Sequence, residues 1–208
     1  MALFRVYHRI RLRYRASRAA VYQPAIELVL MEEPFEAVLA ALRPRRFGDE
    51  DMIQEVMVDS MRHLSGAPFE TLQQAARELG FIEKNVAALR SPRRHRRGRA
   101  LDLLGVMRAA DSVPAILSAL DGELLDQKLV ALRALAAIGD VSALPRFVAQ
   151  AETLPPPLLP RLVSLMFEFG APGRDAVAEI INRHPGQFPP GFIKDILMQF
   201  AGDFEVPR

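Results

Sequence analysis

Cysteine and tryptophan are both absent from this chain of 208 residues. The lack of cysteine excludes thiol catalysis, disulfide bonds and thiolate zinc sites. Only four histidines occur, and none is paired with another histidine or a glutamate at the spacing of a helical metal-binding motif: His8, His63, His95 and His184. The sequence therefore predicts neither a resident metal nor redox chemistry at sulfur.

Long apolar runs are missing as well, since no stretch of 18 uncharged apolar residues occurs and no membrane span is predicted within the chain. Arginines interrupt the N-terminal segment where a secretory signal peptide needs an apolar core. No nucleophile pairs with a base, and no glycine-rich phosphate loop is found. We therefore expect a protein that is not an enzyme and that uses neither a cofactor nor a small-molecule substrate.

Charge is unevenly distributed along the chain, although the formal net charge is only +2. Residues 1–100 carry 18 basic and 12 acidic side chains, whereas residues 101–208 carry 9 and 13. The segment 1–18 contains six arginines and no carboxylate: Arg5, Arg9, Arg11, Arg13, Arg15 and Arg18. We expect residues 1–24 to form a basic, juxtamembrane helix that lies near an anionic membrane surface; the alternative is a leader with no role of its own.

Half of the residues are hydrophobic, which is enough to bury a sizeable core. No segment alternates with a period of two, so we expect an all-α fold. Residues 25–92 predict an irregular helical region packed on the C-terminal half, with Asp49 as a helix cap, Gly66 as a helix end, and Ser91 and Pro92 opening a longer helix.

The sequence pattern of the C-terminal half recurs with a constant period of about 31 residues, as from Leu104 to Leu135. Two apolar positions recur in this register: Leu104, Leu135, Met166 and Leu197, and then Met107, Ile138, Phe169 and Phe200. A constant period of about 31 residues indicates stacked copies of one unit, each too small to bury its own apolar face. We therefore expect an α-solenoid of helical hairpins over residues 93–208.

The stretch ALRALAAIGDVSALPRFV, from Ala131 to Val148, resembles a short HEAT repeat of the bacterial kind: a helix, a Gly-Asp turn, and a second helix with proline near its start. Leu101 to Leu117 matches it in the same register, Ser164 to Ile181 matches it with a turn longer by about two residues, and Asp195 to Asp203 resembles an incomplete last unit. In the first of these Arg108 replaces the glycine, so we expect that turn to be built differently.

The order of a basic N-terminal segment, an irregular helical region and HEAT units is similar to that of bacterial HEAT-repeat proteins that carry a membrane helix at the N-terminus. The resemblance implies a cytoplasmic location, peripheral to or anchored at the inner membrane. This chain contains no such helix, so either one precedes the sequence or the protein is a soluble variant. An upstream span would place the repeats in the cytoplasm, because arginines follow it.

The segment RRHRRGR is the most unusual local feature, because it places five arginines at the start of a predicted helix, where the macrodipole favours acids: Arg93, Arg94, Arg96, Arg97 and Arg99. These side chains could bind phosphate groups, anionic lipid or an acidic protein face. Alternatively, they form a solvated helix end that pairs with carboxylates such as Asp49, Glu50 and Asp51.

The favoured interpretation is a non-enzymatic scaffold or adaptor that binds a protein partner near the cytoplasmic membrane face. Residues on the second helices would contact that partner: Ser118, Arg146, Gln150, Glu179 and Arg183. The alternative is direct binding of anionic lipid or nucleic acid by the arginine clusters. Nucleic acid is the less favoured ligand, because the repeat half is net acidic and has no Trp or Tyr for base stacking. A third hypothesis is an accessory role in modifying a partner, as in HEAT-like proteins of the bilin-lyase type.

Overall fold

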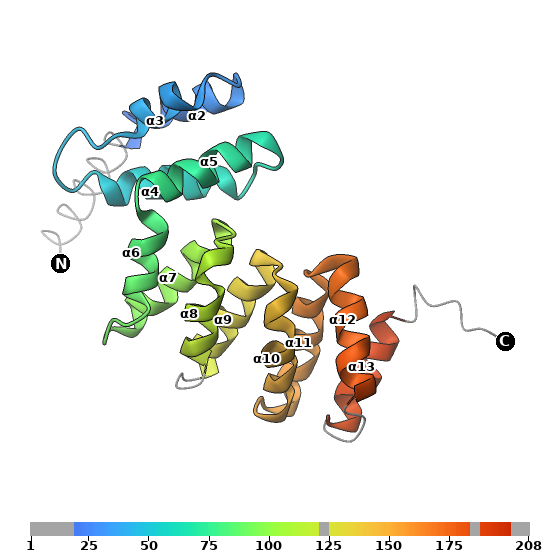
Figure 1. Cartoon of the computed structure of the whole chain (residues 1–208). Coiled ribbons are helices and arrows are strands. Elements are labelled where there is room, and N and C mark those ends of the chain that lie inside the picture. The colour runs from blue at the N-terminus through green and yellow to red at the C-terminus, as the bar shows by residue number, and fades with distance from the viewer. Residues whose placement is uncertain (1–18, 121–124, 184–187, 201–208) are drawn as a thin grey trace, which may run out of the picture. The chain divides into compact units, whose positions relative to one another are not determined.

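A computed structural model of the chain describes residues 19–120, 125–183 and 188–200 (Figure 1). Within these ranges the structure contains twelve α-helices and no strand, so the all-α prediction is confirmed. The chain divides into two compact units, Met1–Lys84 and Asn85–Arg208. This division falls inside α6 (Phe81–Ala88). None of the helices in the described ranges combines the length and the apolar character needed to cross a bilayer.

The first unit contains α2 (Gln23–Leu30), α3 (Phe35–Leu42), α4 (Glu50–Met61) and α5 (Ala67–Glu78). α2 packs against the other three helices, and α5 packs against α3 and α4. The core between them consists of large apolar side chains with almost no exposed surface: Tyr22, Val38, Leu42, Ile53, Met57 and Leu72. Burial of these side chains is the main stabilisation of the unit.

Two predicted helix boundaries in residues 25–92 are wrong. α4 ends at Met61, and Gly66 instead precedes α5, where its φ of +63° turns the chain into the next helix. α7 (Arg94–Val106) begins after Ser91 and Pro92, with Arg93 as its N-cap residue. Ser91 Oγ still accepts a hydrogen bond from the Arg93 N–H, at 3.3 Å, so it supports the turn before the helix rather than capping the helix.

The second unit continues from α7 through six further helices, which lie side by side in Figure 1: α8 (Val113–Leu120), α9 (Leu125–Ile138), α10 (Leu144–Ala149), α11 (Leu159–Phe167), α12 (Gly170–Arg183) and α13 (Pro190–Phe200). α7 packs on α9, α9 on α11, and α11 on α13. α8 and α12 lie against this row, since α8 packs on α9 and α12 packs on α11, and α10 packs on α12. The helices α7, α9, α11 and α13 therefore contact one another in sequence along a row.

The repeated apolar positions lie in this core. Leu104, Leu135 and Met166 are at most 1% exposed, and Met107 and Phe169 are also buried. Ile138 is only half-buried, and the side chains of Leu197 and Phe200 lie outside the described residues. The described members of the first repeated position thus share one environment.

The turn after α7 shares a left-handed residue with the turns after α9 and α11, which corrects the expectation for Arg108. Arg108, Gly139 and Gly170 occupy the same place in successive repeats, with φ of +47°, +74° and +68°. All three have the left-handed conformation, which costs a residue with a Cβ about 1 kcal/mol or more. The arginine adopts this strained conformation because the geometry of the hairpin determines the turn.

α7 and α9 approach each other closely at Gly105. A Cβ atom added to this glycine would lie 2.9 Å from Ala134 Cα and 3.2 Å from Ala134 Cβ. Carbon atoms in ordinary contact are about 3.5–4.0 Å apart. The absence of a side chain at Gly105 therefore allows the two helices to pack backbone against backbone.

Candidate interaction surfaces

Four arginine side chains of the RRHRRGR segment are exposed at the start of α7: Arg93, Arg94, Arg96 and Arg99. The first turn of α7 is Arg94, His95, Arg96 and Arg97, so all the charge that it carries is basic. The helix macrodipole disfavours this arrangement, because it places positive charge at the positive end. The structure thus brings the predicted cluster to the surface of the second unit.

Arg97 differs from its neighbours because it is half-buried. Its Nη1 donates a hydrogen bond to the carbonyl oxygen of Ser91, at 2.9 Å, so part of its function is to hold the chain that leads into α7. Gly98 lies beneath the side chain of Gln127 on α9, and Gln127 Nε2 is 3.2 Å from the position that a Cβ at Gly98 would take. The basic start of α7 is therefore packed on α9.

The N-terminal arginines Arg5, Arg9, Arg11, Arg13, Arg15 and Arg18 lie outside the described residues. The prediction that they lie near an anionic membrane surface stays a prediction.

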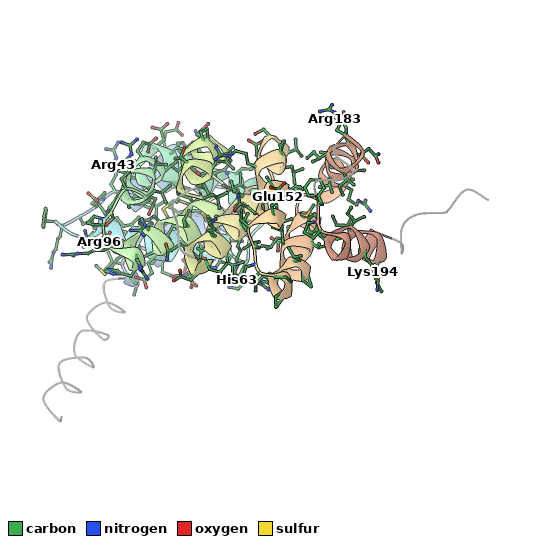
Figure 2. All side chains as sticks on the ribbon, turned by 90° about the horizontal axis from the view of Figure 1, so that it is seen from below. Arg43, His63, Arg96, Glu152, Arg183 and Lys194 are labelled. Carbon is green, nitrogen blue, oxygen red and sulfur yellow. The ribbon has the colours of Figure 1, made fainter. Side chains whose placement is uncertain are left out.

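Four of the five predicted contacts on the second helices are exposed: Ser118 on α8, Arg146 on α10, and Glu179 and Arg183 on α12. Glu179 and Arg183 form an ion pair one turn apart on α12. Figure 2 shows Arg183 on α12 and Lys194 on α13 pointing to opposite sides of the second unit. Arg183 of α12 thus reaches a different face from Lys194 of α13.

Gln150 is buried, which corrects its prediction as a surface contact. Its side chain is 9% exposed and lies where α10 passes into a 3₁₀ turn (Gln150–Glu152). Gln150 Nε2 donates to the carbonyl oxygen of Arg146 at 3.4 Å, and Gln150 Oε1 accepts from Thr153 Oγ1 at 3.2 Å. The end of α10 tightens into this turn, so the face predicted from an unbroken helix does not apply to Gln150.

Sequence reasoning missed a second surface, at the Phe47 loop (residues 43–48) between α3 and α4. In Figure 1 this loop extends away from the helices of the first unit. Phe47 is fully exposed, and Arg43, Arg45 and Arg46, which precede it in the loop, are exposed as well. The loop borders an open hollow of about 510 Å³, lined by Pro44, Arg45, Arg46, Phe47, Gly48, Glu50, Asp51 and Lys84.

A buried pair of polar side chains holds the Phe47 loop. Tyr22 Oη donates a hydrogen bond to Asp49 Oδ2, and both residues are at most 2% exposed. The N–H of Arg45 donates to Tyr22 Oη and the N–H of Arg46 donates to Asp49 Oδ2, each at 3.0 Å. Asp49 was predicted to cap α4, but its carboxylate makes no capping bond to that helix and binds the preceding loop instead.

Lys84 on α6 joins two carboxylates at the edge of the hollow. Its Nζ donates to Glu50 Oε2 at 2.9 Å and to Asp51 Oδ1 at 3.0 Å. Burial by itself would lower the pKa of Lys84, but the hydrogen bonds to Glu50 and Asp51 and their negative charge hold the pKa above its usual value. Glu50 and Asp51, which were considered as partners for the arginines of α7, thus bind a lysine of their own unit.

Comparison with models of known protein families gave no match, and comparison with curated protein sequences gave none either. Among the described residues, no group of three histidine or carboxylate side chains is arranged to hold a metal ion. The proposals on function therefore depend on the exposed residues of the second unit and of the Phe47 loop.

Proposed function

We propose that residues 93–208 form a short α-solenoid of the HEAT type and that the protein is a non-enzymatic scaffold for a protein partner. The contact of alternate helices, α7 with α9, α9 with α11 and α11 with α13, is the observation that supports this proposal. The left-handed turn that recurs once per repeat, at Arg108, Gly139 and Gly170, supports the same periodicity. In such stacks the second helices form an extended surface that binds other proteins.

The partner contacts the second helices, α8, α10 and α12. Ser118, Arg146, Glu179 and Arg183 are exposed there and are not needed for the apolar core. Arginine is one of the residue types enriched in protein interfaces, so Arg146 and Arg183 are the strongest candidates. The six arginines of residues 1–18 support a location near the cytoplasmic face of a membrane.

Site-specific photo-crosslinking tests the scaffold in the cells that produce the protein. A photoreactive amino acid at Ser118 or Arg183 on the second helices should give a discrete crosslinked product. The same amino acid at Arg133 on α9 or Arg161 on α11, both exposed, serves as the matched control and should give none. Products at the control positions alone, or at no position, would contradict the proposal.

A second candidate function is direct binding of anionic lipid or nucleic acid by the basic start of α7. The observation that favours it is the exposure of Arg93, Arg94, Arg96 and Arg99 beside one another. Replacing Arg93, Arg94, Arg96 and Arg97 with Glu should weaken flotation with anionic vesicles or a polynucleotide gel shift. Unchanged binding would exclude the cluster as the binding site.

A further inference from the structure

We propose that the Phe47 loop docks the protein on an anionic lipid bilayer, with the ring of Phe47 at the headgroup boundary and Arg43, Arg45 and Arg46 on lipid phosphates. The loop belongs to the first unit and the second helices belong to the other, so different variants test the two proposals. Either proposal can fail without the other.

Phe47 is the first observation that points to a lipid surface. Phe47 is fully exposed, whereas Phe69 and Phe81 in the same unit are at most 5% exposed. A fully hydrated aromatic ring gains by transfer to an apolar medium, and aromatic side chains are typical of protein segments that lie in the membrane interface. Even the low end of that gain, about 1.5 kcal/mol, corresponds to roughly a ten-fold change in the partition coefficient.

The three arginines supply the charge that an anionic bilayer attracts. Arg43, Arg45 and Arg46 all lie within four residues of Phe47 and are exposed. Each basic residue near such a surface contributes about a five-fold change in binding, equivalent to about 1 kcal/mol. The planar guanidinium group also donates paired hydrogen bonds to phosphate oxygens.

Acidic groups in the same hollow reduce this attraction only in part. Glu50 and Asp51 are both bonded to Lys84, so the three groups together carry a charge of about −1. The arginines of the loop add three positive charges. The surface around Phe47 is therefore net positive.

The loop is held in place before any ligand binds. Tyr22 and Asp49 accept the backbone N–H groups of Arg45 and Arg46, so the backbone is fixed while the side chains project outwards. A preorganised loop loses little conformational entropy on binding. This fixed arrangement distinguishes residues 43–48 from a solvated surface loop that happens to be basic.

A bilayer fits this surface better than a protein or a nucleic acid does. A stable protein interface covers about 800 Å² on each partner around an apolar centre, and Phe47 is the single large apolar side chain of the loop. The backbone from Arg43 to Arg46 spans at most about 11 Å, which is too short to follow a row of nucleic-acid phosphates. Lipid headgroups diffuse laterally and can gather around three arginines and one ring.

The absence of tryptophan allows a direct test in the full-length protein. Phe47→Trp introduces a single indole into the loop, and Met31→Trp introduces one at a control position that is 70% exposed in the same unit. The eight residues of α3 (Phe35–Leu42), about 12 Å of helix, separate the control from the loop. Vesicles of three parts phosphatidylcholine to one part phosphatidylglycerol are the probe, with pure phosphatidylcholine vesicles as the uncharged arm.

With anionic vesicles, the emission of Phe47→Trp should shift to shorter wavelength and be quenched by brominated lipid, while the emission of Met31→Trp should stay unchanged. An equal shift at both positions, or co-sedimentation without a shift at position 47, overturns the proposal. A response of Phe47→Trp to a single-stranded oligonucleotide but not to vesicles also overturns it and assigns the loop to nucleic acid.

A charge-matched pair of variants supplies the second measurement. Arg45→Gln with Arg46→Gln should lower the vesicle partition coefficient about 25-fold, as expected from about five-fold for each residue. Arg133→Gln with Arg161→Gln removes the same charge from exposed positions of the second unit and should change partitioning less than two-fold. Equal losses for the two pairs would show that net charge, and not the Phe47 loop, determines binding.

Discussion

Replacing Gly105 with alanine tests the packing of α7 on α9, on which the row of alternate helices depends. The new methyl group would lie 2.9 Å from Ala134 Cα, which belongs to the backbone of α9 and cannot rotate away. Ordinary contact requires about 3.5 Å or more, so the helices must separate by roughly 0.6 Å. We expect overpacking of this kind to lower the free energy of unfolding by about 1–3 kcal/mol.

The intrinsic effect of the substitution has the opposite sign. Alanine stabilises the interior of a helix by about 1 kcal/mol relative to glycine. The net result for Gly105→Ala is therefore a loss of up to about 2 kcal/mol. Gly98→Ala is the matched control in the same helix, because the methyl group there meets only the flexible side chain of Gln127, at 3.2 Å.

Urea denaturation followed by far-ultraviolet circular dichroism measures both variants. Gly98→Ala should raise the free energy of unfolding by up to about 1 kcal/mol, and Gly105→Ala should lower it, so that the two differ by about 1–3 kcal/mol. If Gly105→Ala were as stabilising as Gly98→Ala, the close contact between α7 and α9 would be refuted.

Three further predictions concern single positions. Gly139→Ala should lower the free energy of unfolding by about 1–2 kcal/mol because φ is +74°, whereas Gly191→Ala in α13 should not lower it; equal effects would contradict the left-handed turn. Tyr22→Phe should cost about 1–3 kcal/mol in urea denaturation, because buried Asp49 loses a donor, and an unchanged midpoint would exclude that bond. The pKa of Lys84 is raised on folding. The stability that Lys84 contributes to the folded state is therefore complete below the unfolded-state pKa and is lost as the pH rises through the folded-state pKa. Lys84→Met should thus lower the free energy of unfolding by less than about 1 kcal/mol near neutral pH, because the Lys84 side chain is 43% exposed. The difference in stability between the two proteins should shrink in strongly alkaline solution. A difference that does not change with pH would contradict the raised pKa of Lys84.

Helices whose ends are marked by local chemistry could be predicted from the sequence. Pro34 separates two apolar segments, and the structure has α2 and α3 on either side of it. Gly80, a residue type that commonly ends helices, follows α5 with φ of +71°. Where the end depends on packing, prediction failed: Gly66 was assigned to the end of α4, and the turn at Arg108 was expected to differ from that at Gly139.

The same distinction between local and long-range features applies to the two candidate surfaces. The basic start of α7 could be found because five arginines lie within seven residues of sequence. The Phe47 loop carries only the short signal RPRRFG, and nothing local shows that Tyr22, more than twenty residues earlier, fixes its backbone. The sequence predicts that Asp49 caps α4, because a capping hydrogen bond is local. In the structure the Asp49 carboxylate instead accepts hydrogen bonds from the Arg46 N–H of the loop and from Tyr22.

By itself, the sequence determined that the chain is helical, that an apolar position recurs with a constant period and that arginine is concentrated in the first half, because residue type and spacing act through local geometry and charge. Only the tertiary structure decided which helices touch, that Arg108 takes a left-handed turn and that Gln150 is buried. It also decided that Phe47 is fully exposed. These features depend on contacts between residues far apart in the chain, and such contacts override the preference of any single residue.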